Sequence, residues 1–434
     1  MMDIASVTIG FFILLGAMTL GLHIATVMFG VGFLGAALYL GWPGVNSMVV
    51  VYLGSMDEAV LLQLPLFILL GEILVRCGAT DRMYRSLSDW LNPLPGGLLH
   101  TNVMSSALFS AVSGSSVATA ATISTVALPS FKKKSYDTRL VLGSIAAGGS
   151  LGNLIPPGIA FIIYGVLTNT SVARLYAAGM LPGILLTVMF MVTIVLLAWW
   201  RPSIAPREVI TDHLVVRLKR LVDLLPPLII FAIVMISIYS GWATSTEAAA
   251  LAVIVTLPIA AFYGKLSIPM LHDAFVSTVN LTALSMLILA GAFALNFILG
   301  LLGVTSALTK FVASMDVTPL QLIYILFVFY VILGTFFETL PMLVGTLPLV
   351  HPLIMAAGID PVWFGVFLVL MCEISLISPP VGLTLYVIQA VRGEGSIGDV
   401  FKGTIPFFIT MLVMTVLLIH FHEIALWLPR YFMG

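Results

Sequence analysis

Small hydroxyl residues, glycines and prolines interrupt the apolar sequence between Ser105 and Pro157. One run, SSALFSAVSGSSVATAATISTVALP, has the polar centre SGSS, and a later run, LVLGSIAAGGSLGNLIPP, ends in a proline pair. Proline pairs remove backbone donors and break a helix, which frees carbonyl oxygens. Because hydroxyl and carbonyl oxygens are the ligands that a hard cation such as sodium prefers, these interruptions predict an ion and substrate site.

The composition of the chain predicts the environment in which that site forms. Of the 434 residues, 60% are hydrophobic and only 9% are charged, and the mean hydropathy is +1.16. Such a chain has too little polar surface for a soluble globule, and its many apolar runs of about 17–25 residues match the thickness of a lipid bilayer. We expect an all-α, polytopic membrane protein whose interruptions lie at mid-membrane depth, where freed carbonyls survive only beside a polar partner.

Other kinds of site find no support in the sequence. The net charge of −1 says nothing about partners. We expect no nucleic-acid partner. The two cysteines, Cys77 and Cys372, lie far apart in or beside apolar runs, which predicts neither a disulfide framework nor a metal cluster. The sequence has no nucleotide loop, zinc motif or haem motif. We therefore expect a protein that is not an enzyme and that uses no cofactor beyond a coupling sodium ion.

The first interrupted segment, residues 98–131, predicts a re-entrant helical hairpin. Its two apolar arms have about 12–15 residues each, too few to cross a hydrocarbon layer of about 30 Å. Lys132, Lys133, Lys134 and Arg139 follow the hairpin, so the positive-inside rule places its mouth in the cytoplasm. A patch that binds nucleic acid or lipid is the alternative interpretation of this basic group, and topology determination is favoured.

The first half of the chain is expected to form N-terminal scaffold helices and an interfacial helix, residues 1–95, and then a first repeat core, residues 96–200. The scaffold is expected to contain two spans, a turn, a third span and an amphipathic interfacial helix, at residues 4–21, 24–40, 41–46, 58–76 and 79–95. The core is expected to contain the hairpin, a broken helix and a span, at residues 98–131, 138–168 and 173–200. A basic linker, residues 201–223, is again expected to be cytoplasmic.

The second half repeats this plan. Scaffold spans are expected in residues 224–317, at 225–240, 243–263 and 272–303. A second core, residues 318–420, is expected to contain a hairpin, a broken helix and a span, at 318–356, 361–392 and 400–420, and a tail follows at 421–434. Pro379 lies 223 residues after Pro156, and Thr339 lies 223 residues after Ser116. Both interruptions recur at one offset, so the chain is predicted to be an internal duplication.

The number of membrane crossings between the two repeats decides whether they have the same or opposite orientations in the membrane. Between the lysine-rich segment and the second hairpin we count five crossings, and an odd number places the second hairpin on the periplasmic side. The repeats would then be inverted, with one hairpin entering from each face, which is how many secondary transporters place a site at the midplane. Both chain termini are expected in the periplasm. The count depends on residues 272–303 forming one crossing, since a segment of that length can hide two.

Several long motifs together resemble one family of membrane proteins. The runs SGSSVATAATIS and GGSLGNLIPPG, the following LYAAGMLPG, and the later FETLPMLVGTLPLVHP and SLISPPVG are similar to the large membrane subunit of tripartite ATP-independent periplasmic (TRAP) transporters, the DctM-like family, over essentially the whole chain. The resemblance implies a sodium-driven importer in the bacterial inner membrane, with a scaffold and a transport domain that moves like an elevator. It also implies two partners, a small four-helix membrane subunit and a periplasmic substrate-binding protein.

The interruptions supply two candidate sodium cages. In the first cage the hairpin tip faces the broken helix, whose carbonyls matter more than its side chains, and the expected residues are Ser110, Ser113, Gly114, Gly152, Ile155 and Pro157. The repeat offset gives a second cage, with the expected residues Leu333, Gly334, Phe336, Ser375, Ser378 and Pro380. The structural alternative for each hydroxyl is a hydrogen bond to its own helix.

An anionic substrate is expected between the two cages, where the N-termini of half-helices present free amide donors. The expected contacts are Ser115, Ser116, Asn153, Thr339 and Thr384. No arginine lies in either interruption, so recognition of a carboxylate would depend on amides, hydroxyls and the sodium ions. In the family that the chain resembles the binding protein does most of the selecting, which leaves C4-dicarboxylates, sialic acid, other sugar acids and sulfonates open.

Charged residues inside apolar runs are further candidates, because burying an unpaired charge is expensive. Glu72 is expected to pair with Arg76 one helical turn later. Those that could serve proton coupling are Glu247, Glu338, Glu373 and Lys310. Glu338 is favoured because it occupies the second hairpin tip, and a structural, hydrogen-bonded carboxylate is the alternative. His351 is expected to be structural.

Two other function classes stay open at this point. The sequence GGSLG matches the G-x-S-x-G pattern of serine hydrolases, so an intramembrane protease could use Ser150 with His351 or His420 as its base. The pattern arises easily by chance in a chain rich in glycine and serine, and a protease explains neither the repeat nor the paired prolines. A passive anion channel is the third class.

Overall fold

The protein is described by a computed structural model that covers residues 22–433 except 133, 206–212, 315 and 316, together with Gly10, Ile13, Gly16 and Ala17. Its described residues form helices and no β-strand. The helices of the first half are α2 (Ile24–Tyr39), α3 (Gly41–Met56), α4 (Gln63–Arg76), α5 (Ala79–Leu91), α6 (Leu98–Ser113), α7 (Ser116–Phe131), α8 (Thr138–Gly149), α9 (Ile159–Thr168) and α10 (Val172–Trp200). The later ones are α11 (Leu214–Arg220), α12 (Leu225–Tyr239), α13 (Ser245–Phe262), α14 (Ile268–Leu301), α15 (Val304–Ser314), α16 (Pro319–Gly334), α17 (Thr339–Ala356), α18 (Pro361–Leu376), α19 (Leu383–Arg392), α20 (Ile397–His420) and α21 (Glu423–Met433).

The fold class predicted from composition is confirmed. Seven helical segments of the described residues are long and apolar enough to cross a membrane by length and composition: Ala59–Arg76, Val172–Trp200, Leu214–Tyr239, Ser245–Phe262, Ile268–Leu301, Thr339–Ala356 and Ile397–His420. Large apolar side chains such as Trp199, Trp200 and Phe262 are exposed on the molecular surface. Exposed groups of this kind are stable against lipid, so the chain is an all-α, multi-pass membrane protein.

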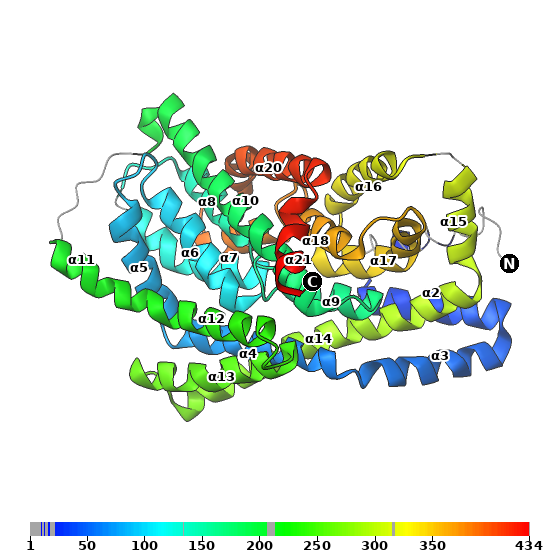
Figure 1. Cartoon of the computed structure of the whole chain (residues 1–434). Helices are drawn as coiled ribbons and strands as arrows, with labels where there is room; N and C mark the ends of the chain where they lie inside the picture. Colours follow the sequence, from blue (N-terminus) through cyan, green and yellow to red (C-terminus); the bar gives the residue numbers. More distant parts are fainter. Residues whose placement is uncertain are drawn as a thin grey trace.

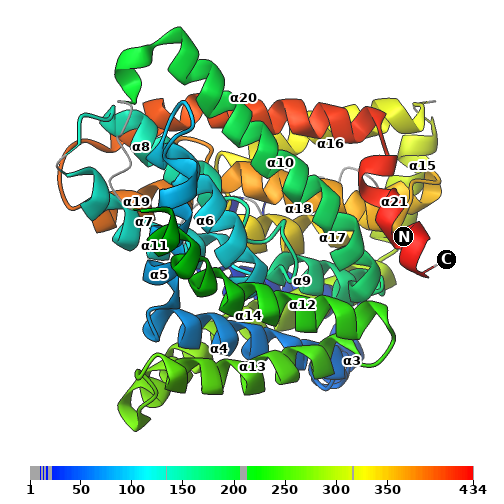
Figure 2. The ribbon, with the colours of Figure 1, turned by 60° about the vertical axis from the view of Figure 1, so that its left-hand side comes forward.

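The helices form two layers. Figures 1 and 2 show α3, α4, α12, α13 and α14 along one side of the molecule and α16 and α20 along the opposite side. Within the first layer α14 packs against α2, α3 and α4, and α13 packs against α4 and α12. We call these six helices, α2, α3, α4, α12, α13 and α14, the scaffold layer. The interrupted helices α6 to α9 and α16 to α19, with α10 and α20, form the core layer.

Side-chain caps fix where several helices begin. The hydroxyl of Thr244 accepts from the backbone N–H of Glu247, whose carboxylate accepts from the N–H of Thr244 at 2.8 Å. Thr318 and Gln321 form the same reciprocal cap at the start of α16. Asp360 accepts from the N–H groups of the first turn of α18. These caps satisfy donors that the bilayer could not, so each helix starts at a defined residue.

Four interruptions divide the core helices. The first lies between α6 and α7, where Gly114 adopts φ +60° and ends α6. The second lies between α8 and α9, the third between α16 and α17, and the fourth between α18 and α19. The second and fourth each contain a proline pair with a cis peptide bond, Pro156-Pro157 and Pro379-Pro380. The inverted relation of the two halves stays a prediction.

Two sequence expectations change in the structure. The predicted turn at 41–46 is wrong, because Gly41 alone makes the turn with φ +67° and the following residues already belong to α3. Pro43 lies in the first helical turn, where proline costs no hydrogen bond. Residues 272–303 do not hide two segments, since α14 is one continuous helix of 34 residues. The predicted span at 4–21 lies almost entirely outside the described residues.

The two basic segments meet at one end of the molecule. The backbone N–H of Asp137, after the first hairpin, donates to the carbonyl of Ile204 in the linker at 2.9 Å. Arg220, at the end of α11, forms an ion pair of 2.8 Å with Asp89 of α5. Figures 1 and 2 place α5 and α11 at the end opposite α15. Both segments that the positive-inside rule assigns to the cytoplasm are therefore neighbours in space.

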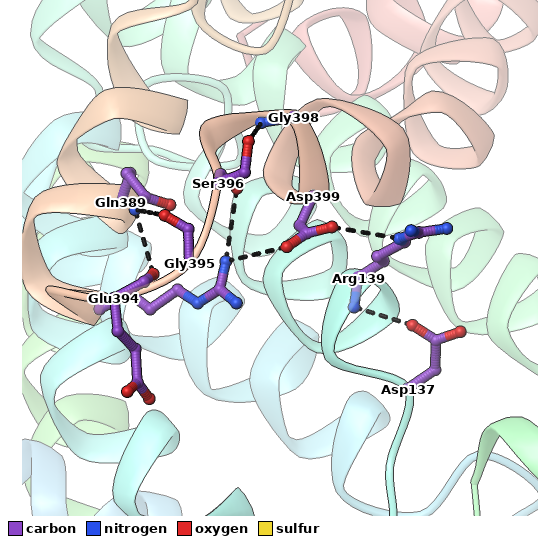
Figure 3. Close-up of polar contacts among 9 residues, drawn as sticks. Asp137, Arg139, Gln389, Glu394, Gly395, Ser396, Gly398 and Asp399 are labelled. Atoms are coloured by element: carbon purple, nitrogen blue, oxygen red, sulfur yellow. Dashed lines mark hydrogen bonds and ion pairs between the residues drawn. The ribbon is translucent and has the colours of Figure 1, made fainter.

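At the same end an aspartate joins the two halves of the chain. Asp399, in the first turn of α20, lies 3.2 Å from Arg139 of α8 and 3.5 Å from Arg392 of α19 (Figure 3). The turn between α19 and α20 is also held by Gln389, whose amide donates to the carbonyls of Glu394 and Gly395. The Asp399 cluster lies at the surface, where water and salt screen its charges.

Replacing Asp399 with asparagine should therefore change stability little. We expect the melting temperature of the purified protein in detergent to fall by less than about 2 °C at low salt, because exposed ion pairs contribute little. The difference in melting temperature should vanish in 0.5 M choline chloride, because this salt screens the ion pairs that the parent has and the variant lacks. A larger fall that persists at high salt would show that this cluster is a main fastening between the two halves.

Candidate functional site: a polar pocket between the two helix layers

The first hairpin tip, Gly114 and Ser115, contacts the interruption that follows α8. The backbone N–H of Ile159 donates to the carbonyl of Gly114 at 3.1 Å. A Cβ on Gly114 would lie 2.3 Å from the carbonyl oxygen of Pro157, so only glycine fits this contact. Two segments predicted to face one another in the first cage are thus in direct backbone contact.

A second contact joins the same two segments at the start of α7. A Cβ on Gly152 would lie 2.3 Å from the Cα and N atoms of Ser116, at the start of α7. The backbone N–H of Asn153 donates to the hydroxyl oxygen of Ser116 at 3.0 Å. Gly114 and Gly152, each predicted for the first cage, are therefore held against the opposite segment.

The hydroxyls of the first cage differ in their hydrogen bonding. Ser110 is fully buried and its Oγ has no hydrogen-bond partner among the described residues. The Oγ of Ser113 lies 2.9 Å from the hydroxyl of Thr119 in α7. Ile155 is buried, and its N–H donates to the carbonyl of Leu151 in the same interruption. A buried oxygen without a partner is costly, so Ser110 has capacity left for a ligand.

Some residues of the second predicted cage also lie close together. A Cβ on Gly334, at the end of α16, would lie 2.8 Å from the Cβ of Ser375 in α18. The hydroxyls of Ser375 and Ser378 donate to carbonyls of their own helix at 2.6 and 2.7 Å, which leaves their lone pairs free. The carbonyl of Pro380 accepts from the Tyr386 hydroxyl. Leu333 is buried, whereas Phe336 is 55% exposed, so the tip of this hairpin is more open than the first.

A cavity of about 400 Å³ lies between the two layers. The scaffold layer contributes residues of α4 and α14, among them Ile68, Gly71 and Leu284, and the core layer contributes residues of both hairpins and of both broken helices. Four of the five predicted substrate contacts line the cavity, namely Ser115, Ser116, Asn153 and Thr339. The fifth, Thr384, lies outside the lining and packs against Gly149. This volume accommodates a small organic molecule.

Unpaired polar atoms and carboxylates mark the walls of this cavity. The hydroxyl of Thr339 is buried and has no hydrogen-bond partner among the described residues. Glu72 and Glu338 contribute carboxyl groups, and the residues that line the cavity include no lysine or arginine. Arg76 forms the predicted ion pair with Glu72 at 2.9 Å, which confirms that expectation. An anion alone would be repelled by the Glu338 carboxylate, whereas an anion bound together with cations is not.

The remaining charged candidates have different places. Glu247 caps α13 and is exposed, so its role is structural. Glu373 is fully buried, and its carboxylate accepts from the hydroxyl of Ser116 at 2.6 Å and from the amide of Asn153 at 2.8 Å. The sequence marks Glu373 as one of several intramembrane carboxylates. Its partners could not be deduced, because they lie 257 and 220 residues away.

The serine of the GGSLG motif has no catalytic partner among the described residues. The hydroxyl of Ser150 donates to the carbonyl of Ala147 at 2.8 Å and lies 3.6 Å from the sulfur of Met411. His351 lies in α17, and His420 contacts Tyr324. A nucleophilic serine needs a base within hydrogen-bond reach, and the geometry does not provide one.

Together these observations define a class of protein. An all-helical membrane protein whose interrupted helices hold a polar pocket between two helix layers has the architecture of a secondary transport protein. The chain belongs to the family described as the DctM component of tripartite ATP-independent periplasmic transporters, whose family model matches residues 9–424. It is a multi-pass protein of the bacterial inner membrane.

Individual relatives agree with this assignment. The chain is 30% identical over 393 residues to the sialic acid TRAP transporter large permease protein SiaM of Vibrio cholerae, which covers 90% of this chain and 91% of the relative. It is 30% identical over 389 residues to the C4-dicarboxylate TRAP transporter large permease protein DctM of Pseudomonas aeruginosa, with 89% and 90% covered. The crystal structure of the YdaH transporter of Alcanivorax borkumensis has a TM-score of 0.61 and 16% identity over 91% of both chains, a likeness of fold alone. The two relatives are permeases and not enzymes.

Proposed function

We propose that this protein is a sodium-coupled importer of an organic acid anion. It would receive its substrate from a periplasmic binding protein and work with a small four-helix membrane subunit. The core layer would carry substrate and sodium past the scaffold layer in an elevator movement. The observation that carries the proposal is the cavity between the layers, since the first hairpin tip and the first broken helix contribute neighbouring residues to its lining.

The chemistry of the oxygen donors supports sodium as the coupling ion. The first cage offers the partnerless Oγ of Ser110 and the carbonyls of a helix interruption, all in a site shielded from water. Hydroxyl and carbonyl oxygens bind hard cations without an obligatory carboxylate. Sodium ions would also offset the carboxylate of Glu338, since Glu72 is already paired with Arg76, and so make room for an anion.

The transported anion is proposed as a class. The names of the two relatives mention sialic acid and C4-dicarboxylates, and both are carboxylates. The hydroxyls of Ser115 and Thr339 can donate to carboxylate oxygens from two sides of the cavity. Sugar acids and sulfonates present similar oxygens. The cavity thus favours a small, hydroxylated or dicarboxylic anion.

Uptake into proteoliposomes tests the proposal. The protein would be reconstituted with the small subunit and the binding protein encoded beside it, and offered labelled succinate, N-acetylneuraminate and isethionate. We expect uptake of one of these acids that requires both an inward sodium gradient and the binding protein. Uptake that persists without either would establish a passive channel instead. Replacing Ser150 with alanine should leave sodium-dependent uptake intact.

The first sodium cage makes a specific prediction. Replacing both Ser110 and Ser113 with alanine should raise the sodium concentration for half-maximal uptake by about tenfold, because two oxygen ligands are lost. The matched control is Ser124→Ala in the same hairpin, since the Ser124 hydroxyl donates to the carbonyl of Ala120 at 2.6 Å and lies outside the cavity lining. An unchanged sodium dependence in the double variant would exclude this cage.

A further inference from the structure

Glu373 connects the second broken helix to the first repeat. It lies in the last turn of α18, before the Pro379-Pro380 interruption, and none of its surface is exposed. Its Oε2 accepts from the hydroxyl of Ser116, and its Oε1 accepts from the side-chain amide of Asn153. Both donors belong to the first repeat and line the substrate cavity. The carboxylate therefore reaches across the boundary between the two halves of the chain.

The hydrogen-bond donors around Glu373 favour an ionised carboxylate. The Oγ of Ser116 accepts from the backbone N–H of Asn153 and from its amide, both at 3.0 Å. Two donors fill the lone pairs of that oxygen, so the Ser116 hydroxyl proton must point to Glu373. The amide of Asn153 also directs an N–H group at Glu373. Each carboxylate oxygen is thus an acceptor, as an ionised carboxylate requires.

This buried charge lacks a cationic side chain. None of the ion pairs between described residues includes Glu373, and the lysine-free, arginine-free cavity lining offers no substitute. Arg76, the cation of the adjoining scaffold helix, is paired with Glu72. Neutral donors lower the cost of burying a carboxylate without removing it. A bound cation would complete the balance of charge.

The first cage is the place where such a cation would lie close. Ser116 follows the hairpin tip directly, and Asn153 follows Gly152 directly. The backbones of Gly152 and Ser116 are in contact, so both donors to Glu373 belong to the wall of the predicted cage. A cation there would be separated from the carboxylate by a single layer of hydrogen-bonded groups.

We propose that Glu373 supplies the negative charge that balances the sodium ion of the first cage, through Ser116 and Asn153, and thereby makes sodium binding in one repeat depend on the other repeat. This proposal rests on the proposed sodium coupling. Glu373 is a positioning residue, since it does not have to touch the ion. With sodium absent, its charge has no counter-ion and the hairpin tip is held less firmly. With sodium present, the first hairpin tip, the interruption after α8 and the second broken helix are held together.

Two variants separate charge from shape. Glu373→Gln keeps the size and removes the charge, and Glu373→Asp keeps the charge with a shorter side chain. Glu394→Gln is the control, because Glu394 lies in the surface turn before α20, at the end of the molecule near Asp399. Each protein would be purified in detergent and melted over a series of NaCl concentrations, with choline chloride holding the ionic strength constant.

We expect Glu373→Gln to raise the sodium concentration that gives half of the thermal stabilisation by at least about tenfold, a change of about 1.4 kcal/mol. Glu373→Asp should stay within about threefold of the parent, and Glu394→Gln should equal the parent. A merely structural role would lower the melting temperature of Glu373→Gln without altering its response to sodium, and that result would overturn the proposal. If Glu373→Gln does not fold, a folded Glu373→Asp protein that has lost the sodium response overturns it equally.

The same experiment separates the two proposals. A parent protein that responds to sodium while Glu373→Gln responds equally well refutes the role of Glu373 and leaves sodium coupling standing. A parent protein that is not stabilised by sodium over choline, and that takes up substrate without a sodium gradient, refutes the proposed coupling itself.

Discussion

Alanine at position 152 should reduce substrate uptake more than tenfold. The Cβ of an alanine at this position would lie 2.3 Å from the Cα and N atoms of Ser116 and 2.5 Å from the carbonyl carbon of Ser115. These are backbone atoms of the first hairpin tip, so no side-chain rotation can relieve the overlap, and the tip must move away from the loop. Overpacking of this kind costs about 1–3 kcal/mol or more. Because the displaced atoms line both the cavity and the first cage, we expect uptake to fall by more than tenfold, as a barrier change of about 1.4 kcal/mol implies.

The control for this prediction is Gly300→Ala in α14. A Cβ on Gly300 would meet no atom within 4 Å, so this variant should transport like the parent protein. Initial uptake rates at saturating sodium, normalised to the amount of reconstituted protein, give the comparison. A Gly152→Ala protein with parental rates and parental sodium dependence would show that the hairpin tip does not pack on this loop.

Replacing Gly403 with alanine should strongly lower the stability of the folded protein. Helices α8 and α20 cross where Gly143 faces Gly403, and a Cβ on Gly403 would lie 1.8 Å from the carbonyl oxygen of Arg139. A Cβ on Gly143 would lie 2.0 Å from the carbonyl oxygen of Gly403. Small residues allow helix backbones in membranes to approach closely, and packing then supplies most of the association energy. Separating these helices should cost about 1–3 kcal/mol or more and lower the melting temperature in detergent.

Gly398→Ala is the matched control, because it lies in the same helix. Its nearest neighbour would be the hydroxyl of Ser396 at 3.4 Å, an ordinary contact. The melting temperature and the yield of monodisperse protein should be lower for Gly403→Ala than for the parent protein. Both should be unchanged for Gly398→Ala. Equal melting temperatures for the two variants would mean that α8 and α20 do not cross at these glycines.

The order of helices and interruptions could be read from the sequence because local chemistry specifies it. A bilayer forces every apolar run of sufficient length into a helix, and a proline pair or a glycine with positive φ ends that helix wherever it occurs. Gly114 and Pro157 therefore identify their interruptions without any knowledge of tertiary contacts. The turn expected at 41–46 failed for the same reason, since glycine and proline also fit the first turn of a helix.

The contacts across the site could be predicted only in part. The sequence predicts Gly114 and Gly152 in one cage because the hairpin tip and the helix break point to them, and the structure places both in backbone contact with the opposing segment. Thr384 was assigned by position alone and lies outside the cavity lining. The partners of Glu373 depend on how two halves of the chain dock, and no periodicity in the sequence records that docking. The scaffold side of the cavity was missed because residues such as Gly71 and Leu284 have ordinary side chains for a membrane helix.

Gly71 has a consequence for the speed of the transport cycle. This scaffold residue lies against the first hairpin tip, where a Cβ would be 3.3 Å from the Cα of Ser113. Contact between two backbones leaves no side chain of one layer inserted between side chains of the other. Surfaces without such interlocking can slide with little activation energy, whereas interdigitated side chains must first be withdrawn. In the elevator movement proposed above, we expect the two layers to slide past this point without withdrawing side chains, so this contact would not limit turnover.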